Sequence, residues 1–423
     1  MVVFARDDYS PLLDISGFLG ILAFSVAVFT LTSPRFQLRQ ATAIIPFRPL
    51  FFGTLLVSAV ITFAIEAFIL YGVRVPNFLS PNTINYLITA AIALLIFYWM
   101  KICFIRPPRF SRFTAKHFFQ QTYLHIANGS KEEMLALARE IMREAPRLIR
   151  HTPRMKRYRF EEDKPVKMST LQTHAHFLNS LLSDTRFCDA VAIEIPSFPA
   201  HMVEVAVKLE RYDAPIQLMV KRTVIAMISK PGSALFVENE WLGQGFIGNT
   251  KPITRSIFGN WYLFEAFDSG LEAPLDLDYP YARSWDTDTW RVYFGIAREY
   301  VRGLTSKGRV NWDARGIHHI LETAEKAYEQ LGDLKKYEDL FSPYNPTWHA
   351  REANEFIKDL VKAFDKSNGW VGFERRDDFR YGHDLSSRLA ALFFEAIFNA
   401  AQVNTKEFRM WDVQHNTVWS PIG

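Results

Sequence analysis

Apolar residues dominate three long runs in the first quarter of the chain and then give way to shorter periodic patterns. The runs cover residues 15 to 32, 50 to 71 and 84 to 105. A helix needs about 20 apolar residues to cross the hydrocarbon core, so the second and third runs are long enough and the first is at the lower limit. We therefore expect an integral membrane protein with three N-terminal transmembrane helices within residues 1 to 105.

The start of the chain favours a retained anchor over a secretory signal. A signal peptide begins with a net positive charge and ends at a small-residue cleavage site. Here Arg6 is outnumbered by three aspartates in the first 14 residues, and Ser33-Pro34-Arg35 follows the apolar run. We expect the first run to remain part of the membrane region.

A polar stripe interrupts the second run. Its members are four residues apart and share one slowly drifting helix face: Thr54, Ser58, Thr62 and Glu66. An ionisable side chain in hydrocarbon costs roughly 2.5 to 3.5 kcal/mol on insertion scales, so it usually faces a bundle interior, a partner or a water path. Two interpretations stay open. The stripe lines a conducting or gating path between several copies of the chain, or it packs helices together.

Loop charges predict the orientation of these helices, because Lys and Arg concentrate in the segments that stay in the cytoplasm. The link over residues 72 to 83 holds only Arg74. The loop after the first run and the segment after the third run contain Arg35, Arg39, Arg48, Lys101, Arg106, Arg109, Arg112 and Lys116. We expect a multi-pass protein of the inner (plasma) membrane, with the N-terminus outside and the C-terminal region in the cytoplasm.

Residues 106 to 165 have the pattern of a basic, helical juxtamembrane connector. A Pro-Pro pair ends the third run. Ser130 and Glu133 have the spacing of a capping box, which predicts a helix from about residue 131. We expect Pro146 to end or kink that helix.

A basic block follows on this connector. It consists of Arg143, Arg147, Arg150, Arg154, Lys156, Arg157 and Arg159, with Glu144 as the only acid before Glu161. One interpretation is a solvated face that meets the bilayer and its anionic headgroups, where each basic residue contributes about 1 kcal/mol. The alternative is a site that docks an acidic protein segment or a nucleotide phosphate. Extended nucleic acid is disfavoured, because the domain beyond is not basic overall.

The periodicity changes to two in the middle of the chain, which predicts a small α+β region over residues 166 to 255. Val191, Ile193 and Ile195 alternate with other residues, as do the apolar positions from 203 to 209. The runs 215 to 229 and 234 to 238 are also typical of strands, although residues 201 to 210 fit a helix too.

Residues 256 to 423 return to a helical pattern. Segments near 256 to 268, 287 to 304, 312 to 331, 347 to 366 and 384 to 402 are each apolar on one face. Gly and Pro residues punctuate them, which favours a helical bundle or a solenoid-like stack. The fold class we expect is therefore a transmembrane helical region followed by a mostly α-helical α+β cytoplasmic domain.

Composition changes this picture little. The 423 residues carry a formal net charge of +4, and their hydrophobic content of 49% averages an apolar first quarter with a charged remainder. There are two cysteines, Cys103 and Cys188, so no disulfide framework is indicated and a reducing compartment is favoured. Cys188 has no basic cluster beside it in sequence, and we expect a buried thiol.

Residues 243 to 248, GQGFIG, match the letters of a dinucleotide-binding motif. Such a site needs a strand directly before the glycines and a helix directly after them. Here the nearest apolar run ends several residues earlier, and Pro252 lies where the helix should already be established. We interpret the segment as a glycine-rich turn.

Histidines and acids occur in patterns that metal sites share. His319 and Glu322 are three residues apart in an expected helix, but a zinc site needs three or four ligands. The other candidates are His174, His176, His318, His383-Asp384, Asp276, Asp278, Asp286 and Asp288. We interpret the histidines as surface or capping residues, Asp384 as the N-cap of the last helix, and Asp286 or Asp288 as that of the helix from 287. We expect no catalytic residue, metal site or cofactor.

These features favour an oligomeric inner-membrane protein with a polar-lined transmembrane bundle, a channel or membrane effector, controlled by a cytoplasmic sensing or docking domain. One stripe per chain cannot line a pore, so self-association is part of this hypothesis. The first alternative is a scaffold or docking subunit of a membrane-embedded secretion or conjugation machine that binds acidic partners. The second is a membrane-tethered enzyme, which the lack of GxSxG and Walker motifs disfavours.

Overall fold

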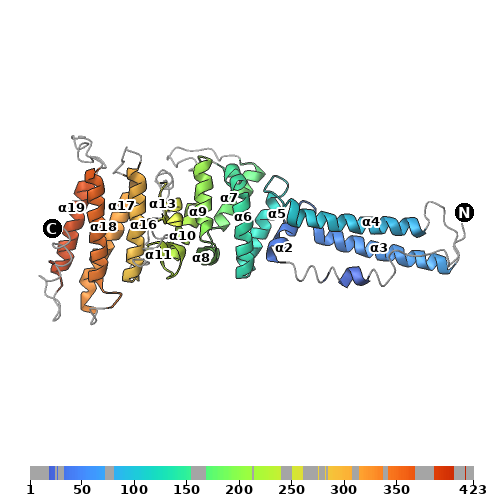
Figure 1. Ribbon diagram of the computed structural model, residues 1–423, viewed down its shortest axis with the longest axis horizontal. Coiled ribbons are helices and arrows are strands. Elements are labelled where there is room, and N and C mark those ends of the chain that lie inside the picture. The colour runs from blue at the N-terminus through green and yellow to red at the C-terminus, as the bar shows by residue number, and fades with distance from the viewer. Residues whose placement is uncertain are drawn as a thin grey trace. The chain divides into compact units, whose positions relative to one another are not determined.

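In a computed structural model the protein folds as a succession of helices (Figure 1). The structure describes residues 19–23, 26, 33–71, 81–153, 168–211, 214–239, 250–260, 275, 282, 284–306, 314–336, 342–366, 385–403 and 415. No strand occurs among these residues. The chain divides into two compact units, Met1–Glu140 and Ile141–Gly423.

The first unit contains a pair of long helices and several shorter ones. They are α2 (Pro34–Ala41), α3 (Phe47–Leu70), α4 (Pro81–Met100), the π-helix η3 (Lys101–Ile105), α5 (Ala115–Asn128) and the beginning of α6 (Lys131–His151). α3 packs along α4, and α2 packs against α3, η3 and α5. The capping box predicted for α6 is confirmed. The Ser130 amide donates to Glu133 Oε2 at 2.7 Å, and the Glu133 amide donates to Ser130 Oγ at 3.3 Å.

The prediction of three N-terminal transmembrane helices is corrected. Among the described helices of this unit, two segments are long and apolar enough to cross a membrane, Phe47–Ile65 and Thr83–Ile105. Most of the first predicted span, 15 to 32, lies outside the described residues. A third apolar stretch, formed by α8 and α9 of the second unit, is bent by 101° between two helices that are each too short to span.

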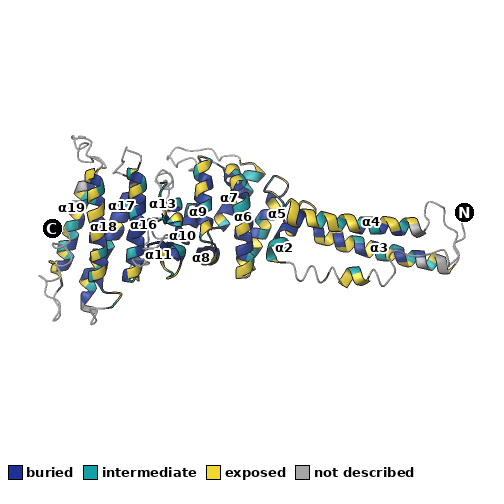
Figure 2. Cartoon of the chain, in the orientation of Figure 1, coloured by how far each residue is buried: buried dark blue, intermediate teal, exposed yellow. Residues whose placement is uncertain are grey.

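The outward faces of α3 and α4 are exposed and apolar (Figure 2). The exposed side chains include Leu56, Val60, Phe63, Leu87 and Leu94. A soluble protein rarely exposes so much contiguous apolar surface, whereas a lipid-facing helix requires it. The burial pattern of the pair therefore agrees with its membrane-spanning length.

The second unit is a series of shorter helices. They are α7 (Thr170–Leu181), α8 (Thr185–Glu194), α9 (Ser197–Lys208), α10 (Gln217–Ile228), α11 (Ala234–Asn239), α13 (Pro252–Phe258), α16 (Thr287–Thr305), α17 (Arg315–Glu329), the 3-10 helix η4 (Gln330–Lys336), α18 (Pro346–Lys366) and α19 (Leu385–Ala401). α8 packs against α10, α9 against α13, α16 against α18, and α17 against α18 and α19. Figure 1 shows α16, α17, α18 and α19 standing side by side.

The prediction of an α+β region is wrong, because the four segments that alternate in hydrophobicity form α8, α9, α10 and α11. Asp184 caps α8 by accepting from the amides of Arg186 and Phe187. Ile193, expected on the same strand face as buried Val191, is 49% exposed. In α9 almost every face is apolar or small, so a period of two over a few valines does not distinguish a strand from a buried helix.

The helices expected toward the C-terminus are found as α16, α17, α18 and α19. Asp286 caps α16 as predicted, since its Oδ1 accepts from the Thr289 amide at 2.8 Å. The segment near 256 to 268 is α13 at its start, and residues 261 to 268 lie outside the described part. Asp384 lies outside it as well.

α6 continues through Pro146 instead of ending there. A proline inside a helix removes the donor that should bond to the carbonyl four residues earlier, here Met142. His201 of α9 replaces that donor, because its Nε2 lies 3.0 Å from the Met142 carbonyl oxygen. A long-range side chain thus satisfies the acceptor that the proline leaves open.

Candidate functional site

The polar stripe of α3 lies partly in the interface between α3 and α4. From Phe51 onward, the buried residues of α3 follow a spacing of four and three: Phe51, Leu55, Ser58, Thr62 and Ile65. Those of α4 follow three and four: Asn85, Ile88 and Ile92. This repeat of 3.5 residues is the spacing that keeps two helices in contact along one seam. We call these eight residues the α3–α4 seam.

Two of the predicted stripe residues are members of the seam. Ser58 is 3% exposed and Thr62 is 7% exposed. Thr62 Oγ1 donates to the Ser58 carbonyl oxygen at 2.9 Å, and Thr54 Oγ1 donates to the Leu50 carbonyl oxygen at the same distance. Each threonine hydroxyl is therefore satisfied by its own helix, as in helices that have no water beside them.

Asn85 of α4 is a polar seam residue that the sequence reasoning missed. It is almost fully buried, and its carbonyl oxygen accepts from Thr89 Oγ1 at 2.9 Å. Small and amide side chains are typical of interfaces between helices in lipid, because they let backbones approach and hydrogen-bond across the contact. The signal that could have found Asn85 is its position three residues before Ile88 and seven before Ile92.

Glu66 is the only charged member of the stripe. Its backbone belongs to α3, and its side chain lies outside the described residues. The structure therefore places Thr54, Ser58 and Thr62, which carry hydroxyls, and not the carboxylate on which the conducting interpretation depended.

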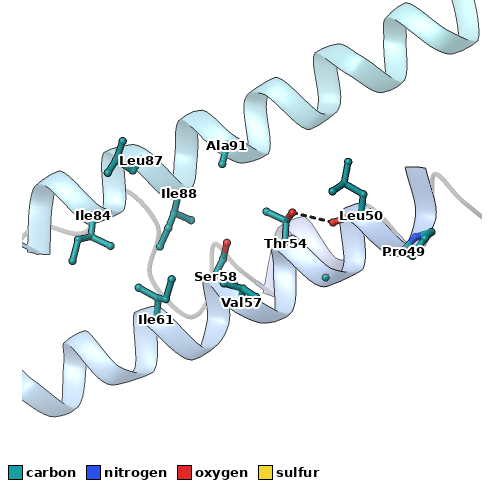
Figure 3. A pocket seen from close by; sticks show the side chains of 11 residues that line it. Pro49, Leu50, Thr54, Val57, Ser58, Ile61, Ile84, Leu87, Ile88 and Ala91 are labelled. Atoms are coloured by element: carbon teal, nitrogen blue, oxygen red, sulfur yellow. Dashed lines mark hydrogen bonds between the residues drawn. The ribbon is translucent and has the colours of Figure 1, made fainter. Parts of the chain in front are cut away.

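A cavity of about 500 Å³ opens on one side of the seam (Figure 3). Its walls carry Thr54 and Ser58 of α3 and Ile84 and Ala91 of α4. Figure 3 shows the Ser58 hydroxyl directed toward α4 and the Thr54 hydroxyl turned back to Leu50. The cavity also borders Gly53, where an added Cβ would meet nothing within 4 Å. There is room here for side chains from another helix.

A buried ion cluster lies where α2, η3 and α6 meet within the first unit. Glu140 is 1% exposed, and its Oε1 lies 2.6 Å from Arg35 Nε and 2.7 Å from Arg39 Nη2. Arg39 also donates to the Cys103 carbonyl oxygen, and Gln40 Nε2 lies 3.8 Å from Cys103 Sγ. Sequence reasoning used these arginines only as loop charges. Their partner is about a hundred residues away, beyond any local pattern.

The basic block is partly neutralised. Arg143 Nε and Arg147 Nη1 lie 3.0 and 2.9 Å from the two carboxylate oxygens of Glu144, whose side chain is buried. Arg150 is exposed. The four remaining cations of the block, Arg154, Lys156, Arg157 and Arg159, lie outside the described residues. The structure thus brings two of the seven cations together on one acid.

Arg211 was missed by the sequence reasoning and closes the end of α6. Its guanidinium donates to the carbonyl oxygens of Ile149, Arg150 and Thr152 at 2.7 to 3.1 Å. A cation at the C-terminus of a helix satisfies its last carbonyls and complements the helix dipole. Arg211 therefore satisfies backbone carbonyls at the C-terminal end of α6, as Ser130 satisfies a backbone amide at the N-terminal end.

The metal-like patterns do not converge within the described residues, where no group of three His, Cys, Asp or Glu side chains could hold a metal ion. His319 Nδ1 lies 3.5 Å from Glu322, and this contact lowers the pKa of that carboxyl. Glu322 also approaches Arg388 at 3.6 Å. Asp288 pairs with Arg291 at 2.7 Å. His383, Asp384, Asp276 and Asp278 lie outside the described part.

The helix that follows the glycine-rich segment already has an anion at its N-terminus. Residues 243 to 248 lie outside the described part, but α13 begins at Pro252. Glu238 of α11 accepts from the amides of Ile253 and Thr254 at 2.9 and 2.8 Å. A phosphate loop delivers its phosphate to such amides. Here a buried carboxylate occupies them, so these amides are not open to a phosphate.

Cys188 is a buried thiol, as its sequence context predicted. Burial raises its pKa to about 11, and its Sγ donates to the Leu182 carbonyl oxygen at 3.4 Å.

A function can be based on three of the arrangements described above: the α3–α4 seam, the ion cluster on Glu140 and the basic block on α6. A comparison of the chain with family models, curated proteins and solved structures finds no match.

Proposed function

We propose that the protein is a docking scaffold anchored in the inner membrane by the α3–α4 pair, with its helical second unit in the cytoplasm, where it binds an acidic protein segment. The observation that carries this proposal is the burial of Ser58 and Thr62 in the α3–α4 seam. The Thr62 hydroxyl is buried and bonded within α3, so it is not available to line a path for ions. Anchoring thus accounts for the polar stripe without conduction.

The ion cluster on Glu140 supports placing α2 and the beginning of α6 on the same side of the membrane. Arg35 and Arg39 lie between the first apolar run and α3, whereas Glu140 follows α4. Both segments carry the charges that the positive-inside rule assigns to the cytoplasm. If α3 and α4 cross the membrane, their pairing requires the two segments to lie on one side of it.

The docking role draws on Arg150 and on the cations that follow it in sequence. Arg143 and Arg147 share Glu144, so they contribute less net charge than the sequence alone indicates. Arg150 is exposed at the end of α6, and the cations from Arg154 to Arg159 continue from it. An acidic segment would gain charge-assisted hydrogen bonds with these guanidinium and ammonium groups.

The test uses the full chain reconstituted in liposomes of neutral lipid. A fluorescent polyglutamate peptide is titrated against the protein and against an Arg150→Gln/Arg154→Gln/Arg157→Gln variant. We expect the variant to lose most of the binding, and an Arg298→Gln variant, changed far away in sequence on α16, to retain it. Equal binding by all three proteins would refute the docking role.

A second function, conduction by an oligomer, is favoured by the cavity beside Thr54 and Gly53. An open apolar site whose lining includes the small residues Gly53, Ser58 and Ala91 accepts a helix from a second copy, as small residues do in membrane interfaces. Ion flux from the same liposomes separates the two functions. The scaffold predicts no flux, whereas a charged pore predicts a cation flux that Glu66→Gln reduces.

A further inference from the structure

A second cavity, of about 450 Å³, lies in the first unit where α4 passes into η3 and the chain turns away from the helix. Lys101, Arg106 and Arg109 line it. All its lining residues are described, and no carboxylate is among them. Arg35 and Arg39, by contrast, have a carboxylate beside them, since both are paired with Glu140.

The loop that carries two of these cations is held in place. The Arg106 amide donates to the Lys101 carbonyl oxygen at 2.6 Å. Thr114 Oγ1 donates to the Arg109 carbonyl oxygen at 2.5 Å and accepts from the Ser111 amide at 3.0 Å. A Pro-Pro pair between the two arginines fixes the intervening backbone. The backbone is therefore set before any ligand arrives, which lowers the entropic cost of binding.

One wall of the same cavity is apolar. Ile44 lines it and is 60% exposed, although it is a large hydrophobic side chain. Tyr98 lines it as well, and its hydroxyl hydrogen-bonds to the backbone of Ile45. Tyrosines near the end of an apolar helix mark the level of the lipid headgroups. A cationic rim beside an exposed apolar wall matches a ligand that has an anionic group attached to hydrocarbon.

We propose that this cavity binds the headgroup of an anionic phospholipid, with the phosphate at Arg106, Arg109 and Lys101 and an acyl chain over Ile44. The inference rests on the proposed membrane crossing of α3 and α4. A free phosphate ion would use the same cations, but it would leave Ile44 exposed. Arginine suits the role because its planar group bonds to two phosphate oxygens at once.

The experiment titrates the full chain in detergent with phosphatidylglycerol and with phosphatidylethanolamine of the same acyl chains, and counts bound lipids by native mass spectrometry. The variant Arg106→Gln/Arg109→Gln removes two lining cations. The matched control Arg112→Gln/Lys116→Gln removes two exposed cations from the same stretch that do not line the cavity. Both variants change the net charge equally.

We expect one phosphatidylglycerol to bind in preference to phosphatidylethanolamine, and its affinity to fall about 30-fold in the lining variant, on the basis of the usual contribution of each basic residue near an anionic lipid. The control variant should stay within about twofold of the parent, since its cations face solvent. A single Lys101→Gln change should lower the affinity about fivefold and serves if the double variant does not fold.

Three outcomes would overturn the headgroup site. They are equal loss in the control variant, no preference for phosphatidylglycerol, and displacement of the lipid by an excess of inorganic phosphate, which would identify a free-anion site. Alkaline washing of reconstituted vesicles distinguishes failure of the headgroup site from failure of the proposed membrane anchoring. A chain that is washed off does not cross the membrane, whereas a chain that is retained without lipid preference refutes the headgroup site alone.

Discussion

The α3–α4 pair satisfies its threonine hydroxyls within one helix, and the second unit, which does the same at Thr223 and Thr323, adds side chains that bond across helices. In the pair, Thr54 and Thr62 bond to carbonyls of their own helix. In the second unit, His201 and Glu238 reach backbone groups of other helices. The difference teaches where a substitution is expected to matter. A self-satisfied hydroxyl can be removed together with its interaction, whereas removing a cross-helix partner leaves a buried group unpaired.

The largest effect is expected at Glu140. It belongs to the first unit, but its carboxylate pairs with arginines of another helix, unlike the threonine hydroxyls of the α3–α4 pair. Glu140→Ala leaves Arg39 buried without its carboxylate, and breaking a buried ion pair in this way costs about 3 to 5 kcal/mol. The thermal unfolding midpoint of the full chain in detergent measures the loss. Asp359→Ala, which removes the partner of Arg298 in an exposed pair, is the control and should cost at most about 1 kcal/mol. Equal losses would contradict the assignment.

His349 of α18 makes the second unit sensitive to acid. It is buried against Trp290 and near Gln330, and burial lowers its pKa from 6.5 to about 4. Because the pKa is lower in the folded state, stability is complete above pH 6.5 and decreases as the pH falls toward 4. Lowering the pH from 7 to 5 should therefore reduce the free energy of unfolding by about 2 kcal/mol through this histidine.

The measurement compares the pH dependence of unfolding in the parent and in His349→Gln. The glutamine can still donate a hydrogen bond but does not titrate, so the variant should show a shallower slope over that window. Other histidines are present in both proteins and cancel in the difference. Parallel slopes would show that His349 is not the group responsible.

A smaller effect is expected where His201 replaces the donor that Pro146 lacks. His201→Ala should cost about 1 to 3 kcal/mol, because the Met142 carbonyl oxygen loses its partner. In a Pro146→Ala background the helix supplies an amide at that position, so the same change should cost clearly less. A double-mutant cycle on the free energy of unfolding gives the coupling. A coupling near zero would mean that water or another group takes the place of the imidazole.

The smallest effect is expected in the α3–α4 seam. Thr62→Val keeps the shape of the side chain and removes only a hydroxyl that bonds to the Ser58 carbonyl of the same helix. Even hydrogen bonds between membrane helices contribute only about 0.6 kcal/mol on average, so removing this bond within one helix should hardly move the unfolding midpoint. A loss as large as that of Glu140→Ala would show that the two regions do not differ in the way described.

Local signals were predictable from the sequence, and long-range ones were not. Ser130 with Glu133, and Asp286 before α16, were found because a cap and its helix lie within three residues. Glu140 could not be assigned, since its arginines are about a hundred residues away. The candidate site shows the same division. The stripe from Thr54 to Thr62 was visible as a spacing, whereas its use in a seam with α4 depends on tertiary packing.

Two differences from the sequence patterns have a common physical origin. The valines of α9 alternate over only a few residues, which wrongly favoured a strand, and α6 continues past Pro146, which was expected to end or kink it. In both places the packing of neighbouring helices outweighs the local preference. α9 is buried on most of its faces, and His201 on α9 supplies the bond that Pro146 gives up.

The carboxylate of Glu238 at the start of α13 has a consequence for the order of folding. A helix of seven residues does not persist by itself in water, because its nucleation cost exceeds what so few bonds return. Its first amides find their acceptor only when α11 is helical and docked nearby. α11 has only six residues and is subject to the same cost, so the two helices should form and dock together as one cooperative step.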